Sequence, residues 1–342
     1  EVSPDDPNKI YATSFYDGEV DSLSGISVSS DGGVTWVNPL SSRPDMDFCP
    51  SIASTFSWNT ETQQFLDQSD DGSIIENQYV WGQGNFAAMG ISINPANSDE
   101  VYIGTACGLA VTKDAGITWE FIDPPADHVN KIIGQWFGGW KNDPLFKSLH
   151  QPTKIWDVVV HDNGIVDVCG EEGHFRKIPN SFSWSTSVDP SLGLPGGLCS
   201  IAVSPHESNV LFAVVGTSIY TSIDGGSSWF DSPIGEPGST QGRVPFIETN
   251  EIDNNTFDLW YGDVRLYSKS CTTPLPTDIN YDDLVDNFRC NDTGINNSIW
   301  VDQQAGSHAD AGSILFDPTV SINSCPILYS NDGGVYYNTN SP

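Results

Sequence analysis

A histidine and several carboxylates in this sequence stand where they could do chemistry. His308 and Asp310 lie two positions apart just before an apolar stretch. There an imidazole and a carboxylate could bind a substrate hydroxyl or shuttle a proton. The alternative is a histidine that caps the turn and bonds to the backbone. Asp258, Asp263 and Arg265 favour an ion pair at a strand end over a binding site.

Aromatic residues form a second group. The loop from Trp136 to Trp140 could be a sugar-stacking platform, because flat rings match the apolar faces of pyranoses. The alternative is a loop that packs its own small core. We expect the candidate ligand-binding residues to lie exposed on one rim of the fold, and they are Trp136, Trp140, Trp260, Arg265, Trp300, His308 and Asp310.

Catalytic and metal-binding groups cannot be assigned from the residues alone. A glycosidase needs two carboxylates at a set separation, and 45 acidic residues leave that pair undetermined. No Cys/His grouping has the spacing of a zinc site, and Cys169, Cys199 and Cys325 stand alone. No Asp-x-Asp-x-Asp-Gly loop supports calcium. We therefore expect no cofactor, with structural Ca²⁺ as the open alternative.

An eight-residue phrase recurs along the chain and predicts how these groups are positioned. It reads Ser29–Trp36, Thr112–Trp119 and Ser222–Trp229, with a degenerate copy at Ser330–Tyr337. Within such a phrase a Ser or Thr and an Asp can bind backbone N–H groups of a tight turn, and the Gly tolerates positive φ. We expect the first three copies, through Asp31, Asp114 and Asp224, each to join the third and outer strands of a sheet. The residues predicted to be structural are Ser29, Asp31, Gly33, Trp36, Thr112, Asp114, Gly116, Trp119, Ser222, Asp224, Gly226, Trp229, Ser330, Asp332 and Gly334.

This phrase is the Asp-box, or bacterial neuraminidase repeat, and the chain resembles that superfamily of β-propellers. Its long repeats resemble xyloglucanase and sortilin propellers more than sialidases. The resemblance implies a recognition or scaffold module for an extracellular glycan or polypeptide, with a glycoside hydrolase acting on extracellular polysaccharide as the alternative. A sialidase is disfavoured, because the arginine cluster that it needs would have to come from five arginines, and Phe175-Arg176-Lys177-Ile178-Pro179 carries a Lys inside the Phe-Arg-Ile-Pro signature.

The spacing of the phrase predicts an all-β propeller. The phrase aspartates lie 114 − 31 = 83, 224 − 114 = 110 and 332 − 224 = 108 residues apart. A four-stranded blade takes about 40–50 residues, so about six to seven blades are expected. The template strands are Met89–Pro95, Val101–Thr105, Gly108–Val111 and Trp119–Ile122, repeated at Ile201–Pro205, Val210–Val215 and Ser218–Thr221.

Other segments fit this template less closely. Residues 37–85 form either an extra blade or decoration, and 270–298 reads as a long loop. Degenerate blades are predicted over Ile155–Trp184 and Val244–Tyr267. Residues 1–342 are expected to form a single propeller that begins inside an inner strand and ends inside a blade, as an excerpt of a longer chain. The rival expectation is a ring closed by the two termini.

Charge and cysteine content restrict the partners. The net charge of −32 disfavours nucleic acid, and no apolar run is long enough to insert into a membrane. Expected partners are an extracellular glycan or polypeptide, or further domains of the same chain. A disulfide between Cys271 and Cys290, and the sequons at Asn254, Asn291 and Asn296, favour a secreted glycoprotein.

Overall fold

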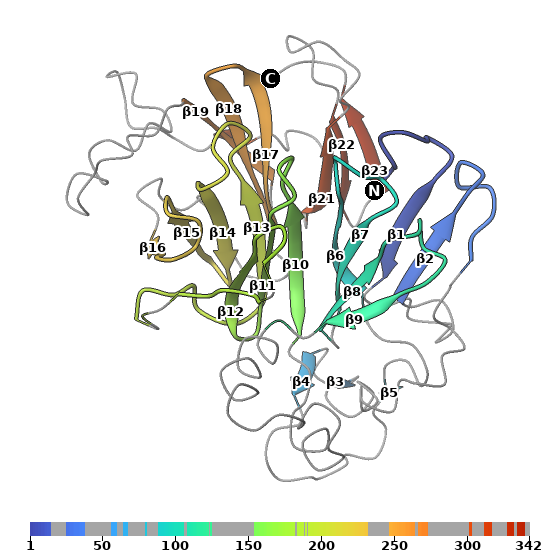
Figure 1. Ribbon diagram of the computed structural model, residues 1–342, viewed down its shortest axis with the longest axis horizontal. Helices are drawn as coiled ribbons and strands as arrows, with labels where there is room; N and C mark the ends of the chain where they lie inside the picture. Colours follow the sequence, from blue (N-terminus) through green and yellow to red (C-terminus); the bar gives the residue numbers. More distant parts are fainter. Residues whose placement is uncertain are drawn as a thin grey trace. The chain divides into compact units, whose positions relative to one another are not determined.

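The computed structural model is an assembly of antiparallel β-sheets (Figure 1). No helix among the described residues is long and apolar enough to cross a membrane. The structure describes residues 1–14, 25–37, 56–59, 64–67, 79–80, 88–105, 108–122, 124, 154–181, 183–187, 189, 191–231, 246–263, 266–272, 301–302, 311–316, 327–331 and 334–338.

The chain divides into two compact units. Unit 1 comprises Glu1–Glu171 and Lys177–Ser185. Its sheets have the orders β1-β2, β4-β3-β5, β6-β7-β8-β9 and β10-β11-β12, although β12 as far as Arg176 belongs to unit 2. The strands are β1 (Ile10–Ser14), β2 (Gly25–Ser29), β3 (Phe56–Asn59), β4 (Gln64–Asp67), β5 (Tyr79–Val80), β6 (Ala88–Ile93), β7 (Val101–Thr105), β8 (Gly108–Thr112), β9 (Glu120–Ile122), β10 (Ile155–Val160), β11 (Val166–Gly170) and β12 (Gly173–Lys177).

Unit 2 comprises Glu172–Arg176 and Thr186–Pro342. Its further sheets have the orders β13-β14-β15-β16, β17-β18-β19-β20 and β21-β22-β23. The strands are β13 (Cys199–Val203), β14 (Leu211–Val215), β15 (Ser218–Ser222), β16 (Phe230–Asp231), β17 (Phe246–Asp253), β18 (Thr256–Gly262), β19 (Leu266–Thr272), β20 (Val301–Asp302), β21 (Ala311–Phe316), β22 (Ile327–Asn331) and β23 (Gly334–Asn338).

Three sheets share the same connection between their first two strands. The N–H of the residue that follows the first strand donates to the carbonyl of the residue that precedes the second strand. The N–H of this second residue donates in turn to the carbonyl three positions before it. All six bonds are 2.9 Å long, and they link Ser3–Lys9–Asp6, Asn94–Glu100–Asn97 and Ser204–Val210–Glu207. The start of the chain therefore makes the same hydrogen bonds as the ends of β6 and β13, as expected if it begins inside an inner strand.

The first sheet completes the repeat through two isolated bridges. Val2 pairs with Ile10 in β1, and Val28 in β2 pairs with Val37. The order Val2, β1, β2, Val37 matches the four-strand order β6-β7-β8-β9 and β13-β14-β15-β16. The template predicted from the sequence is thus present at each of the first three copies of the phrase.

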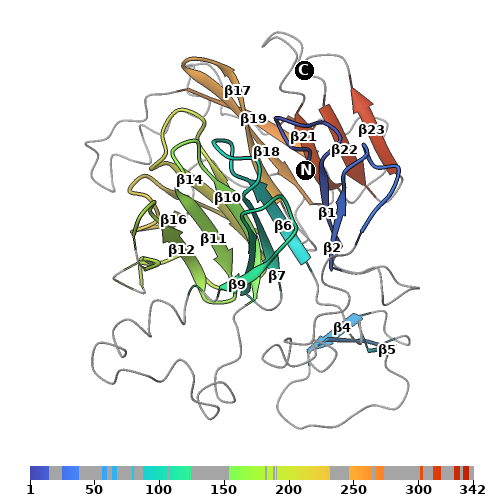
Figure 2. The same ribbon diagram turned by 45° about the vertical axis from the view of Figure 1, so that its right-hand side comes forward.

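Neighbouring sheets within a unit pack closely. In unit 1, β10 lies against β6 and β7 (Figure 2). A side chain at Gly104 would bring its Cβ within 2.6 Å of the Ile155 carbonyl oxygen, so the absence of a side chain permits this approach. In unit 2, Phe212, Ile247, Phe257 and other side chains of β14, β17, β18 and β19 form one apolar core.

The fourth copy of the phrase departs from the expectation. In the first three copies the Ser or Thr ends the third strand, and the turn follows. Here Ser330 lies inside β22, and Asn331 pairs directly with Gly334 of β23. Only Asp332 and Gly333, outside the described residues, separate the strands. A two-residue Asp-Gly connection is typical of a hairpin, so the prediction that Ser330 and Gly334 belong to the same turn as in the other copies is wrong.

Candidate functional site

The best-defined polar structures are the turns at Ser29–Trp36, Thr112–Trp119 and Ser222–Trp229, here called the repeat turns. In the first, the Ser29 hydroxyl donates to Asp31 Oδ1 at 2.9 Å and accepts the Gly33 N–H at 2.9 Å. The Thr35 N–H donates to Asp31 Oδ1 at 2.8 Å, and the Thr35 hydroxyl donates to Oδ2 at 2.5 Å. The other two repeat turns make the same bonds through Thr112, Asp114, Gly116 and Thr118, and through Ser222, Asp224, Gly226 and Ser228.

Each repeat turn is also bonded to the connection between the first two strands of its own sheet. The bonds are Gly32 N–H to the Asn8 carbonyl at 3.0 Å, Ala115 to Asp99 at 2.9 Å and Gly225 to Asn209 at 2.9 Å. Each repeat turn is therefore fixed to its own sheet, and the aspartate that holds the turn together has a structural role. Hydrogen bonds from Thr35, then Ser29, lower the pKa of Asp31 below 3.8, and bonds from Thr118 do the same for Asp114.

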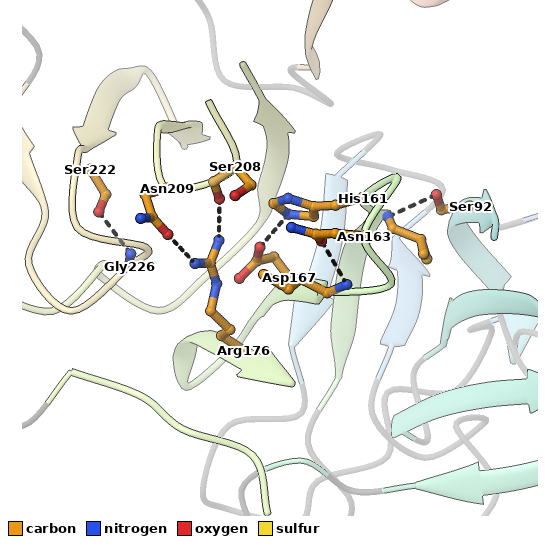
Figure 3. A network of polar contacts seen from close by, with 11 residues as sticks. Ser92, His161, Asn163, Asp167, Arg176, Ser208, Asn209, Ser222 and Gly226 are labelled. Carbon is orange, nitrogen blue, oxygen red and sulfur yellow. Dashed lines mark hydrogen bonds and ion pairs between the residues drawn. The ribbon is translucent and has the colours of Figure 1, made fainter. Parts of the chain in front are cut away.

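Two side chains of β12 cover the third repeat turn. The Arg176 guanidinium donates to the Ser208 carbonyl at 2.8 Å and to Asn209 Oδ1 at 3.3 Å (Figure 3). The His174 ring lies edge-on to Trp229, with ring centroids 5.2 Å apart. Because Arg176 is 6% exposed and holds the backbone of this connection, it is not placed to grip a substrate carboxylate as a sialidase arginine would.

A buried histidine–aspartate pair lies at the β10–β11 connection. His161 Nε2 is 2.6 Å from Asp167 Oδ2, and the side chains are 3% and 0% exposed (Figure 3). His161 follows β10 as Ser204 follows β13, and its N–H donates to the Ile165 carbonyl at 2.9 Å. The pair has the composition of a catalytic dyad. Because both side chains are buried, the pair instead fits a structural role, in which it links β11 to the residue that follows β10.

Hydroxyl groups tie the first strands of adjacent sheets to each other. In unit 1, the Val160 N–H of β10 donates to Ser92 Oγ of β6 at 3.0 Å. In unit 2, the Ile247 N–H of β17 donates to Ser200 Oγ of β13 at 3.2 Å, and the Thr249 hydroxyl donates to the Val203 carbonyl at 2.6 Å. These buried polar groups join one sheet to the next.

The β18–β19 pair holds two perturbed ionisable groups. The Ser270 hydroxyl donates to Asp258 Oδ1 at 2.5 Å, and burial raises the pKa of Asp258 although that bond opposes it. Burial lowers the pKa of Lys269 to about 8. Their partners in register are Ser270 and Leu259, so the two side chains lie on opposite faces of the sheet. Arg265, the expected ion-pair partner of Asp258 and Asp263, lies outside the described residues.

The structure describes few of the predicted ligand-binding residues. Trp260 lies in β18 and is 2% exposed, so the expectation that it is an exposed rim aromatic is wrong. The tryptophan sits beside Phe257 and Leu259 in an almost entirely buried strand, a position that its isolated sequence context did not reveal. The others lie outside the described residues, namely Trp136, Trp140, Arg265, Trp300, His308 and Asp310.

The structure adds to what the sequence indicated about the cysteines. Cys169 in β11 and Cys199 in β13, which form no metal-binding grouping in the sequence, are each disulfide-bonded. Cys271 is disulfide-bonded as predicted, and its expected partner Cys290 lies outside the described residues. Asn254 is exposed at a hairpin tip, whereas Asn291 and Asn296 are not described.

No group of His, Cys, Asp or Glu side chains able to hold a metal occurs in the described part of the chain.

The sequence reasoning missed the His161–Asp167 pair. The sequence did contain a signal for the turn, because the apolar strand is followed by His161-Asp162-Asn163-Gly164, which is rich in turn-forming residues. That signal indicated a turn, but not the pairing of its histidine with the second residue of the next strand.

No family model and no curated protein matches this chain. An ancestral GH74 enzyme matches all of it with a TM-score of 0.56 and 13% identity, and the chain spans 39% of that enzyme. The GH74 xyloglucanase from Xanthomonas campestris matches with a TM-score of 0.46, 15% identity and coverage of 100% of this chain and 52% of that one. YCF48 bound to D1 peptide matches with a TM-score of 0.38, 12% identity and coverage of 98% and 91%. These neighbours are β-propeller proteins, and the first likeness shows an all-β fold of propeller type, without fixing an activity.

Proposed function

We propose that this chain is a secreted recognition or scaffold module of the Asp-box propeller type, whose ligand is a neutral extracellular glycan or a polypeptide. One observation carries the proposal. The described side chains best suited to chemistry are engaged in holding the fold: the repeat-turn aspartates, the His161–Asp167 pair and Arg176. Binding residues are often carried by surface loops that such a rigid scaffold positions.

Charge and cysteine chemistry support the class of ligand and the compartment. A net charge of −32 repels anionic polymers, which favours neutral sugars or peptides. Disulfide-bonded Cys169, Cys199 and Cys271 favour an oxidising environment, because disulfides persist in secreted proteins and are rare in the cytosol.

The binding surface is proposed to lie on the long segments that carry Trp136, Trp140, Trp300, His308 and Asp310. Tryptophan rings there would stack on the apolar faces of pyranoses, and His308 with Asp310 would bind hydroxyl groups. The alternative is a glycoside hydrolase, in which His308 and Asp310 take part in turnover. It is favoured by the likeness of the fold to a GH74 enzyme.

The purified chain should be tested against arrays of neutral polysaccharides and peptides, with binding and release of reducing ends measured on the same ligands. The variants are Trp140→Ala, the double change His308→Ala with Asp310→Ala, and the control Trp36→Ala on a repeat turn. We expect binding without turnover, lost in the first two variants and kept in the control. Turnover abolished by the double change would contradict the module and select the hydrolase, and absence of binding would contradict both.

A further inference from the structure

The β17–β18 hairpin presents an asparagine at its tip. Asp253 and Thr256 form the last pair of the ladder, which leaves Asn254 and Asn255 as a two-residue connection. Asp253, Asn254 and Asn255 are all exposed. The sequence Asn254-Asn255-Thr256 satisfies the Asn-x-Thr pattern of an N-glycan acceptor, a short motif that needs such a surface position to carry weight.

The bonds that hold this tip leave out the Asn254 side chain. The Asn255 N–H donates to Asp253 Oδ1 at 2.8 Å. That bond, together with one from the Thr256 hydroxyl, lowers the pKa of the exposed Asp253. Among the described residues, the turn is thus formed by the neighbours of Asn254. A group attached to its amide would project into solvent without breaking these contacts.

The base of the hairpin is fixed in the core of unit 2. Ile247, Phe257 and Leu259 are each 0% exposed and belong to the same apolar cluster. The Thr249 hydroxyl donates to the Val203 carbonyl of β13 at 2.6 Å. The tip is therefore held at a defined surface position, and folding does not bury the acceptor.

A cysteine of the same sheet supplies independent support. Cys271 in β19 lies in register with Phe257 of β18 and is disulfide-bonded. Structural disulfides form in the secretory compartment of eukaryotic cells and on export in other cells. N-glycans are added along the same route, so the chemistry of Cys271 and of Asn254 agrees on one environment.

We propose that Asn254 carries an N-linked glycan. In that reaction Asn254 Nδ2 attacks C1 of a sugar held on a lipid-linked diphosphate donor. The C1–N bond forms, the bond from C1 to the diphosphate oxygen breaks, and the lipid diphosphate leaves while the amide loses one proton. No oxidant or reductant takes part. The Thr256 hydroxyl is the group that the transferase recognises, and in the folded protein it turns to Asp253.

The full chain should be secreted from insect cells and digested, and the peptide spanning the tip analysed by mass spectrometry before and after treatment with peptide N-glycosidase. The variants are Asn254→Gln and the matched neighbour Asn255→Gln, which keeps the Asn-x-Thr pattern. We expect the glycan on the wild type and on Asn255→Gln, and its complete loss in Asn254→Gln. Thr256→Ser should keep it and Thr256→Val should lose it.

Folding provides the companion measurement. Because the Asn254 side chain lies outside the bonds of the turn, Asn254→Gln should be secreted with an unchanged melting temperature after enzymatic removal of glycans from both proteins. An unmodified Asn254 peptide in the folded, disulfide-bonded wild type would overturn the proposal. So would a glycan that persists in that region of Asn254→Gln. Asn291 and Asn296 lie in other peptides, and ligand binding is measured separately, so neither result depends on the proposed function.

Discussion

At the scale of single residues, one carboxylate organises each repeat turn. Asp224 Oδ1 accepts the Ser228 N–H at 2.9 Å and the Ser222 hydroxyl at 2.9 Å, while Oδ2 accepts the Ser228 hydroxyl at 2.5 Å. A side chain that accepts three bonds from residues between Ser222 and Ser228 fixes the path of the backbone there. The aspartate is thus a structural element of the repeat turn.

Replacing this carboxylate tests that role. Asp224→Ala should lower the free energy of unfolding by about 1–2 kcal/mol, the scale of lost hydrogen bonds in a structured turn. Asp231→Ala, at an exposed position of β16, is the control and should change it little. Denaturant unfolding measures both. A variant that kept full stability but lost ligand binding would show that Asp224 belongs to a site.

Acid sensitivity should follow from the same turns. The folded-state pKa values of Asp31 and Asp114 lie below the usual 3.8, because hydrogen bonds favour the ionised forms. Their contribution to stability is therefore present above pH 3.8 and is lost as pH falls through the folded pKa values. The stability difference between wild type and the Asp31→Asn, Asp114→Asn double variant should be constant near neutral pH and shrink below 3.8. A difference that widens in acid would contradict this linkage.

Sequence predicted the repeat-turn residues because their bonding is local. Ser29, Asp31 and Gly33 interact within five positions, so the pattern of residue types contains the geometry. Trp260 and the pairing of His161 with Asp167 depend on which strand faces which, and a single sequence does not show that. The fourth copy shows the limit of the motif, because an Asp-Gly pair also suits the two-residue hairpin found there.

At the scale of elements, glycines allow a strand to lie against a repeat turn. Gly226 has a φ of 82° and lies where a Cβ would meet the His174 ring of β12. Gly216 has a φ of 60° with nothing within 4 Å of such an atom. The two positions share the backbone requirement and differ in the space available.

This difference predicts unequal effects of the same substitution. Gly216→Ala should cost about 1–2 kcal/mol, the strain of a left-handed alanine. Gly226→Ala should cost more, because the His174 ring must also move. In a His174→Ala background the excess should disappear, which a double-mutant cycle measures. Equal costs in the wild-type background would show that the packing of β12 on this turn contributes nothing.

The repeat-turn tryptophans make a second comparison between elements. Trp36 and Trp119 donate equivalent bonds to the carbonyls of Gly33 and Gly116 at 3.0 and 3.1 Å, yet they are 44% and 5% exposed. Trp119 belongs to the apolar cluster that contains Tyr11 and Val28 of the first sheet. Because both tryptophans make the same hydrogen bond, a difference in the free energy of unfolding between Trp36→Ala and Trp119→Ala would reflect burial.

Trp119→Ala should therefore cost about 3–5 kcal/mol, as for other buried tryptophans. Trp36→Ala should cost clearly less, and in the wild type Trp36 should be the more accessible to an aqueous fluorescence quencher. Similar losses in the free energy of unfolding would mean that the first repeat turn is covered in solution.

At the scale of the whole molecule, local signals predicted the propeller-type fold. The strands β7 and β14 fall within one residue of their predicted bounds, since apolar runs between Pro and Gly mark them clearly. The length of the β17–β18 hairpin was not predicted, because the sequence there indicated only a degenerate blade without a repeat turn. Strand periodicity does not reveal which exposed segments a ligand would contact, so the proposed ligand could not be derived from the same signals.

The net charge of −32 should make stability depend on salt. Like charges repel more strongly in the compact state, and raising ionic strength from about 0.01 M to 1 M shortens the Debye length from about 30 Å to about 3 Å. The melting temperature should therefore rise with sodium chloride, and equally with potassium chloride. Calcium chloride in the millimolar range, added at constant ionic strength, separates screening from a bound ion. Screening alone predicts no further shift, whereas a rise confined to calcium would favour a structural Ca²⁺ site, and a melting temperature that falls with sodium chloride would show that favourable charge pairs outweigh the repulsion.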